Sequence, residues 1–120
     1  MTASGSDPFA PFIRDLPMVD SPLASLRGWM LGNEGGLAMF YEIPDGVEVP
    51  EHAHGAQWGV VLEGTVEFTI GGETRVYGPG ETYYVPDSVT HRAVISPGYV
   101  GIDVFADADR YSARPREETR

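Results

Sequence analysis

The 120-residue sequence contains no cysteine, which excludes disulfide bridges, thiolate metal ligands and a cysteine nucleophile. It also lacks any apolar run close to the roughly 18 residues that a membrane-spanning helix requires. Its N-terminal segment contains no basic stretch followed by an apolar one, so no secretory signal peptide is expected. These absences predict a cytoplasmic protein with no membrane partner.

Basic residues are scarce as well. Lysine and arginine together number 8 against 18 aspartate and glutamate residues, which gives a formal net charge of −10. Nucleic acids and anionic lipid surfaces would repel such a chain, so we expect neither as a partner. A small anionic ligand is not excluded, because a metal ion inside a pocket dominates the electrostatics of its own surroundings.

Helical signals are few. Only residues 23–31 show a weakly helical pattern, and Gly28 and the adjoining Gly32 interrupt it. Short apolar–polar alternations dominate instead, as in residues 37–43 and 66–70, with turn-forming pairs such as Gly71-Gly72 between them. Many short strands separated by turns predict an all-β sandwich or barrel, and closure would remove its exposed strand edges.

The length and the 42% hydrophobic content fit one globular domain. Residues 1–22 are rich in proline, serine, glycine and aspartate and are predicted to form an N-terminal arm. Residues 23–110 are predicted to form the β-barrel domain, and residues 111–120 a polar C-terminal tail. Three apolar residues could attach the arm to a surface or to a second subunit: Phe9, Phe12 and Ile13.

The three histidines of the chain fall in two places. His52 and His54 are two residues apart, so on a strand both side chains would leave the same face. Gln57 follows shortly, and one irregular residue would bring it to that face, while His91 lies on a later strand. Neutral imidazoles with an oxygen ligand suit Fe, Mn, Ni, Cu or Zn, and three histidines with an open position are typical of a catalytic metal site. The alternative is that these are ordinary histidines.

Two segments of the sequence resemble the conserved motifs of the cupin family. GVEVPEHAHGAQWGVVLEG, residues 46–64, resembles the first motif, which reads Gly, five residues, His-x-His, a few residues, Glu, six residues, Gly. GETYYVPDSVTH, residues 80–91, resembles the second, which reads Gly, five residues, Pro-x-Gly, two residues, His. Every histidine of the chain lies at a ligand position of the family, and the strand pattern extends the resemblance over residues 23–105.

The resemblance implies a single-domain cupin jelly-roll barrel that holds one divalent transition metal ion. Its implied ligands are His52, His54, Gln57 and His91. Gln57 stands where the family usually has a carboxylate, Ser88 replaces a turn glycine, and Ile95 replaces a common asparagine. The first departure matters most for function. A neutral glutamine leaves the full charge of a divalent metal for an incoming ligand and removes one candidate general base.

Similar small cupins include dioxygenases, sugar isomerases and epimerases, lyases, polyketide cyclases and proteins that only bind a ligand. Some that have three histidines and one glutamine act on uronate sugars or aromatic polyketides. We therefore expect a metal-dependent enzyme of the isomerase, lyase or cyclase type acting on a small anionic or enolisable substrate, because such steps need only a Lewis acid. The alternatives are a metal-dependent dioxygenase and a non-catalytic cupin that binds a small ligand.

Several other residues are candidates for a role in the pocket. Tyr83 and Tyr84 are adjacent, so only one can face inward, where it could act as an acid, a base or a stacking platform. The catalytic candidates are Tyr84 and Tyr41, with packing as the alternative for both. Arg75 and Arg92 could hold a substrate carboxylate, although Arg92 should point away from the metal because it neighbours His91.

A homodimer is the expected assembly. Small jelly-roll domains that resemble this one often pair sheet to sheet, and twofold dimers are the commonest assemblies. Trp58 follows Gln57 and should leave the opposite face of the strand. There it is expected to pack in a core or an interface, and a role in the pocket is the alternative.

Overall fold

A computed structural model of the chain describes residues 7–115. Within this range there are one short helix and eleven strands: α1 (Pro11–Arg14), β1 (Val19–Asp20), β2 (Arg27–Asn33), β3 (Gly36–Ile43), β4 (Val47–His52), β5 (Gln57–Glu63), β6 (Val66–Ile70), β7 (Glu73–Tyr77), β8 (Thr82–Val85), β9 (His91–Ile95), β10 (Tyr99–Phe105) and β11 (Ser112–Ala113). No helix in this range is long and apolar enough to cross a membrane. The near absence of helix confirms the all-β prediction.

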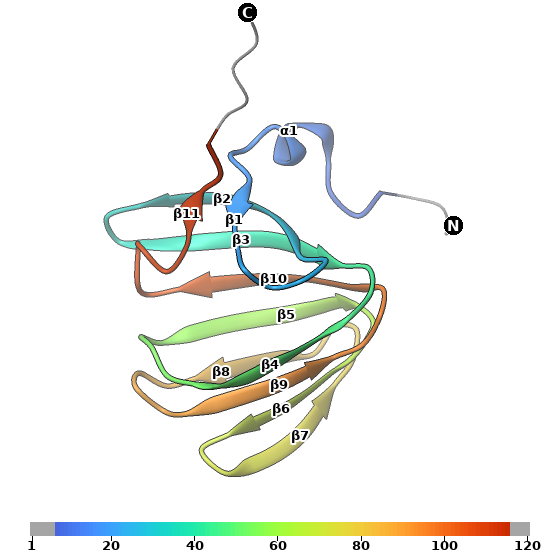
Figure 1. Cartoon of the computed structure of the whole chain (residues 1–120), viewed down its shortest axis with the longest axis vertical. Helices are drawn as coiled ribbons and strands as arrows, with labels where there is room; N and C mark the ends of the chain where they lie inside the picture. Colours follow the sequence, from blue (N-terminus) through green and yellow to red (C-terminus); the bar gives the residue numbers. More distant parts are fainter. Residues whose placement is uncertain (1–6, 116–120) are drawn as a thin grey trace, which may run out of the picture.

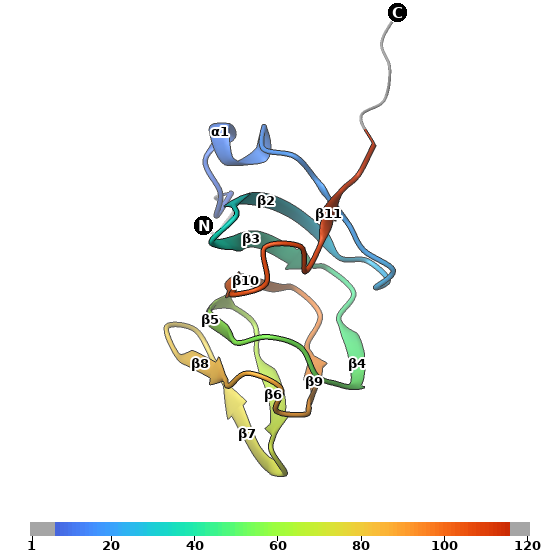
Figure 2. The ribbon, with the colours of Figure 1, turned by 90° about the vertical axis from the view of Figure 1, so that its left-hand side faces the viewer.

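Nine of these strands form two antiparallel sheets that face each other. The five-stranded sheet has the order β2-β3-β10-β5-β8, and the four-stranded sheet has the order β4-β9-β6-β7. Figure 1 shows the strands stacked along the long axis of the molecule. Figure 2 shows β3, β10, β5 and β8 on one side of the interior and β4 and β9 on the other. The arrangement is the predicted jelly roll.

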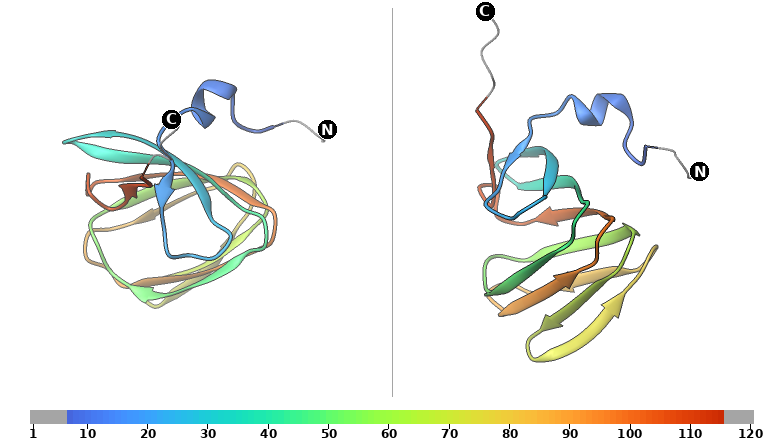
Figure 3. Two further views of the ribbon diagram at one scale, coloured as in Figure 1. Left: turned by 45° about the horizontal axis from the view of Figure 1, so that its top comes forward. Right: turned by 45° about the vertical axis from the view of Figure 1, so that its right-hand side comes forward.

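The two sheets remain separate within the described residues. Each ends in edge strands, so they do not form one continuously hydrogen-bonded cylinder. The expectation that closure removes the strand edges is therefore corrected: the fold is a jelly-roll sandwich whose strands surround a common interior, as the left-hand view of Figure 3 shows. Residues 23–31, which show a weakly helical pattern in the sequence, include the first part of β2, because Arg27–Asn33 pair along their whole length with β3.

The core lies between the two sheets. Along β3 the burial alternates strictly, so that Leu37, Met39, Tyr41 and Ile43 face inward, as the sequence alternation predicts. Inward residues of β5, β6, β8 and β10 complete this core. It contains three tyrosines, Tyr41, Tyr83 and Tyr99, whose hydroxyl groups need hydrogen-bond partners there.

The N-terminal segment packs on the outer face of the five-stranded sheet. Phe9 is buried, with its ring 6.2 Å from that of Trp29 and 5.9 Å from that of Phe40. Phe12, in contrast, is 73% exposed. β1 pairs with β11, so the ends of the predicted arm and tail meet in a small sheet of their own. The division into an arm at 1–22, a domain at 23–110 and a tail at 111–120 stays a prediction, and residues 1–6 and 116–120 lie outside the described part.

Candidate metal centre

The three histidines converge although they come from different elements. His52 ends β4 and stands directly opposite His91, the first residue of β9, in the pairing register. Their ring centroids are 4.2 Å apart, and the His54 ring lies 4.7 Å from that of His91. One ligand nitrogen from each ring lies within 4.8 Å of the other two. Antiparallel pairing thus brings the two sequence motifs together.

His54 reaches the cluster from a loop and not from a strand. The sequence argument placed His52 and His54 on one strand face, but β4 ends at His52. The backbone N–H of Ser88 donates to the carbonyl oxygen of His54 over 2.8 Å, which ties this loop to the turn before His91. Ser88 has a φ of +64°, the left-handed conformation for which the family motif normally supplies glycine.

Hydrogen bonds orient all three imidazoles in the same way. The Nδ1 atoms of His52, His54 and His91 lie 2.8, 2.7 and 2.9 Å from backbone carbonyl oxygens of residues 50, 55 and 89. A carbonyl can only accept, so each Nδ1 carries the proton and each Nε2 presents a lone pair. Backbone carbonyls are common orienting partners for histidines that bind metal ions through the other nitrogen.

This arrangement fits a divalent transition metal. The Nε2 atoms of His54 and His91 lie 3.1 Å apart, although two lone pairs at that distance repel each other. Two nitrogens bound at about 2.1 Å to one metal at right angles lie about 3.0 Å apart, so one cation would relieve the repulsion. Burial, together with the positive charge of neighbouring groups, lowers the pKa of His54 and of His91. Both rings therefore stay neutral and able to bind a metal.

Gln57 is buried at the start of β5, beside the histidines on the cavity wall. Its Nε2 donates a hydrogen bond of 2.5 Å to Oδ2 of Asp103. Because the amide nitrogen is committed to this carboxylate, the amide oxygen is the end that remains for another partner. The role of that oxygen as a fourth metal ligand stays a prediction.

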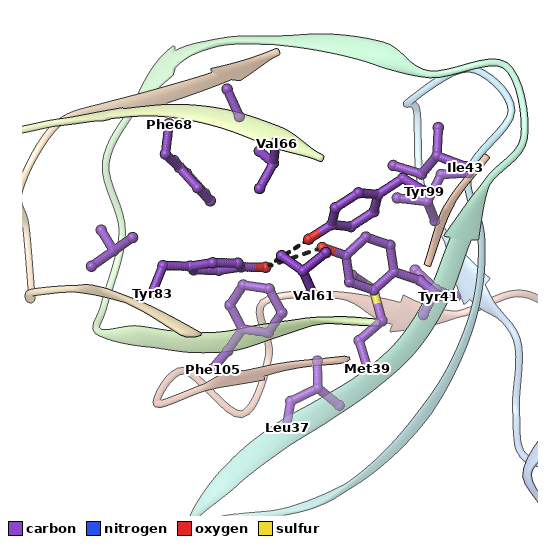
Figure 4. Packing of buried hydrophobic residues seen from close by; sticks show 14 residues of the cluster. Leu37, Met39, Tyr41, Ile43, Val61, Val66, Phe68, Tyr83, Tyr99 and Phe105 are labelled. Atoms are coloured by element: carbon purple, nitrogen blue, oxygen red, sulfur yellow. Dashed lines mark hydrogen bonds between the residues drawn. The ribbon is translucent and has the colours of Figure 1, made fainter. Parts of the chain in front are cut away.

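Asp103 is the residue that sequence reasoning missed. It is 3% exposed in the middle of β10, where its Oδ1 accepts hydrogen bonds from the hydroxyl groups of Tyr83 and, over 3.3 Å, Tyr41. Figure 4 shows the hydroxyl groups of Tyr41, Tyr83 and Tyr99 converging in the core. Residues 99–105 are mostly apolar, and Asp103 occupies an inward-facing position among them. A carboxylate at such a position is rare, and this was the sequence signal for it.

The electrostatics of this network follow from its burial. Burial raises the pKa of Asp103 to about 6, against the lowering effect of its three hydrogen-bond donors. Burial, reinforced by the Asp103 charge, raises the pKa of Tyr41 and of Tyr83 well above the ordinary value and that of Tyr99 to about 12. The phenols therefore keep their protons and act as donors toward a carboxylate that titrates near neutral pH.

A glycine makes room for the network. Gly59 on β5 lies opposite Asp103 on one side and Tyr83 on the other in the sheet register. A Cβ at position 59 would overlap both the Asp103 carboxylate and the Tyr83 ring. Any other residue there would therefore displace them.

The histidines and the Asp103 network share one cavity of about 320 Å³ between the sheets. Its wall is mostly apolar and includes Met39, Ile43 and Phe68. Its polar groups come from a small set of residues: the three histidines, Gln57, Asp103, Arg110, Ser21, Tyr41, Tyr83 and Tyr111. An apolar hollow with a few convergent polar groups is typical of a small-molecule site.

The catalytic candidate at position 84 is corrected. Tyr84 is 59% exposed on the outer face of β8, while its neighbour Tyr83 points into the cavity, because successive strand residues face opposite sides. Tyr41 lines the cavity, as expected of a candidate. Trp58 is 43% exposed on the outer face. Arg75 stacks on Tyr77 and pairs with Glu81, and Arg92 is exposed, so neither faces the cavity.

The fold and this cluster define a jelly-roll domain with a three-histidine site that can hold a metal ion. Comparison with known families gives the same result, since the cupin domain family matches residues 39–98, which is half of the chain. The chain belongs to the cupin family.

Individual proteins are similar to this chain in structure or in sequence. A cupin described as RmlC-like, from Shewanella frigidimarina, is 29% identical with a TM-score of 0.71, over 88% of this chain and 95% of that one. KdgF from a Halomonas species is 24% identical with a TM-score of 0.65, over 73% of this chain and 84% of that one, which shows the shared fold. The mannose-1-phosphate guanylyltransferase ManC of Salmonella typhimurium is 37% identical over 61 residues, which are 51% of this chain but 12% of the relative.

Proposed function

We propose that the protein is a metal-dependent enzyme of the isomerase, lyase or cyclase type acting on a small anionic or enolisable substrate. The observation that carries the proposal is that three oriented imidazoles and a buried carboxylate face the same apolar cavity. Metal-assisted proton transfer needs both parts, whereas a domain with a purely structural role needs neither. Burying a carboxylate costs free energy, and a carboxyl group with a perturbed pKa in a cavity is typical of a functional site.

The chain's own residues suit proton transfer at a polarised substrate. A divalent metal ion bound by His52, His54 and His91 would supply Lewis acidity toward a substrate carbonyl or hydroxyl oxygen. Asp103 can hold or take up a proton at its carboxylate oxygens, because its pKa of about 6 lies near neutral pH. Tyr41 and Tyr83 direct their hydroxyl hydrogens toward Oδ1 and keep that oxygen in place. The apolar walls limit the access of water.

The test is a turnover assay in D₂O. Protein loaded separately with zinc, manganese, nickel or iron would be incubated with uronates and with 2-keto and 2-hydroxy acids, and proton NMR would record exchange of C–H hydrogens or new products. Uronates come first, because similar cupins with three histidines and one glutamine act on them. Oxygen uptake in the same samples would identify a dioxygenase instead, and calorimetric binding without turnover would identify a ligand-binding cupin.

Adjacent tyrosines provide a matched control. Tyr83→Phe removes a hydroxyl that bonds to Asp103, whereas Tyr84→Phe removes one from the outer face. We expect Tyr83→Phe to slow turnover and Tyr84→Phe to leave it unchanged. Asp103→Asn should reduce turnover by on the order of a hundredfold, the usual contribution of a general acid or base. Full activity of the Asp103→Asn variant would refute the proposed role of the carboxylate.

We further propose that the protein acts in the cytoplasm as a homodimer. The pairing register places five apolar residues in one row across the outer face of the five-stranded sheet: Leu31, Ala38, Val104, Trp58 and Tyr84. Four of them are between 41% and 59% exposed, and no charged side chain interrupts the row. A second copy of the same face would cover this apolar row.

A further inference from the structure

The cavity contains one cationic side chain besides the histidines, that of Arg110, to which the sequence argument assigned no role. Arg110 follows β10 in the loop that leads to β11, and it lines the cavity with the histidines. The chain has no lysine, so all eight of its fixed positive charges are arginines. Arg110 is the only arginine on this wall among the described residues.

Arg110 is held firmly in position. Its guanidinium carbon lies 4.5 Å from the centre of the Tyr111 ring and 5.7 Å from that of Phe105. These two rings pack edge to face, and the Phe105 ring also contacts that of His54. Stacking on aromatic faces fixes the plane of the guanidinium and so the direction in which its N–H groups point.

The loop that carries Arg110 is fastened to the loop that carries His54. The Asp107 carboxylate accepts a hydrogen bond of 2.8 Å from the backbone N–H of Gly55, and the carbonyl oxygen of Asp107 accepts one of 3.1 Å from the N–H of Arg110. The N–H of Ala106 also donates to the carbonyl oxygen of Ala56 over 2.9 Å. The guanidinium therefore keeps a fixed position relative to the histidines.

The guanidinium nevertheless has no anionic partner in the described part of the chain. Arg14, Arg27 and Arg75 each pair with a carboxylate, whereas no such pair involves Arg110. Its Nε is buried and has no hydrogen-bond acceptor among residues 7–115. An unsatisfied buried donor is costly, and a chain with 18 acidic residues has many carboxylates that could have met it.

We propose that Arg110 binds a carboxylate group of the substrate, while the histidine-bound metal holds a hydroxyl or carbonyl group at the other end of the same molecule. The substrate class is therefore small acids that carry a metal-chelating hydroxy or keto group at one end and a second carboxylate at the other. A planar guanidinium matches a carboxylate with two parallel hydrogen bonds. This inference rests on the proposed metal-dependent function.

The test compares matched ligands that differ by one carboxylate. Zinc-loaded protein would be titrated calorimetrically with 2-hydroxybutyrate and malate, and then with 2-hydroxyvalerate and 2-hydroxyglutarate. Within each pair a methyl group is replaced by a carboxylate. The two pairs differ in the distance between the hydroxyl group and that carboxylate. Wild-type protein should bind at least one diacid about tenfold to a hundredfold more tightly than its matched monoacid, as expected for a charge-assisted bidentate contact.

Variants then assign the preference to Arg110. Arg110→Gln should reduce the preference for the diacid to within about threefold. Arg110→Lys keeps the positive charge but cannot donate two parallel hydrogen bonds, so it should give an intermediate preference. Arg75→Gln is the control, because it removes the same charge from an exposed hairpin residue. A preference that survives in Arg110→Gln, or that is equally lost in Arg75→Gln, would overturn the proposal, as would wild-type protein that prefers neither diacid.

A second measurement separates this proposal from the metal-dependent function. In metal-free protein, the Nε–H resonance of Arg110 would be followed by NMR during titration with acetate, with chloride at the same ionic strength as the comparison. A saturable shift with acetate alone supports Arg110 as a carboxylate site even if zinc does not bind. No shift in a protein that does bind zinc would overturn the Arg110 proposal and leave the metal site standing.

Discussion

Replacing Asp103 by asparagine offers a quantitative test of how burial controls the candidate site. Asparagine is close to aspartate in size and keeps an oxygen for the hydroxyl groups of Tyr41 and Tyr83. It cannot ionise, and its amide nitrogen would face the amide of Gln57, which must turn over to present its oxygen. The variant therefore resembles the wild-type protein with a protonated Asp103.

The sign and size of the effect follow from the pKa. The pKa of Asp103 rises from 3.8 in the unfolded chain to about 6 in the folded state. The folded protein thus keeps a proton that the unfolded chain has lost, so the stability contributed by this group falls as the pH rises from about 4 to about 6. The full shift corresponds to about 3 kcal/mol, of which about 1.4 kcal/mol is lost between pH 5 and pH 8.

The assay is urea unfolding of wild-type and Asp103→Asn protein at pH 5 and pH 8 with a chelator present. Metal must be removed because a nearby cation would lower the pKa of this carboxyl group. Working at pH 5 and above keeps the protein on the anionic side of its isoelectric point of about 4.5. The free energy of unfolding of the variant, relative to wild type, should increase by about 1.4 kcal/mol between the two pH values.

This comparison isolates Asp103 from the other titrating groups. The lowered pKa values of His54 and His91 make stability fall as the pH drops below about 6.5, but both proteins share that term. Asp87→Asn makes the same chemical change in an exposed turn and should behave as wild type at both pH values. A difference between Asp103→Asn and wild type that is the same at pH 5 and pH 8 would refute the idea that burial opposes ionisation of Asp103.

Four further predictions concern the metal, the ligand and the assembly. His91→Ala should reduce bound transition metal from about one equivalent per chain to a small fraction by elemental analysis, because two histidines hold a divalent ion poorly, and unchanged content would contradict the site. Gln57→Glu replaces the N–H that Asp103 accepts by a second carboxyl group, so one of the two should keep a proton. With that proton on Asp103 and the glutamate oxygen toward the metal, metal binding should hold or strengthen and oxalate binding should weaken by about 1–3 kcal/mol through the lost positive charge. Equal or tighter oxalate binding at the same metal loading would contradict the role of a neutral glutamine. Trp58→Glu should convert a dimer to a monomer by light scattering at micromolar concentration, and a monomeric wild type would count against the dimer. Gly59→Ala should lower the free energy of unfolding, measured in urea, by about 1–3 kcal/mol, because the added Cβ overlaps the Asp103 carboxylate and the Tyr83 ring. An unaltered free energy of unfolding would show that these two side chains can move aside without cost.

The sequence alone was enough for the fold class and for the meeting of the histidines. Alternation along residues 37–43 reports which side chains share a face, and the structure buries Leu37, Met39, Tyr41 and Ile43 as that pattern predicts. The spacing of the two motifs was sufficient to bring His52, His54 and His91 together, because it encodes the turns on both sides of the strand pair β4 and β9. These features depend on local periodicity and on residue types, which are visible in one dimension.

The remaining features depend on which strands become neighbours, and only the tertiary structure decides that. Alternation shows that Tyr83 and Tyr84 face opposite sides of β8 but not which side is the interior, so the wrong member of the pair was favoured. The carboxylate of Asp103 is buried, and its pKa raised to about 6, only because β3 and β5 become the neighbours of β10. Arg110 belongs to the cavity because long-range hydrogen bonds fasten its loop beside His54. Burial and the electrostatic environment of a side chain depend on residues that are distant in the sequence. Local sequence patterns therefore cannot predict them.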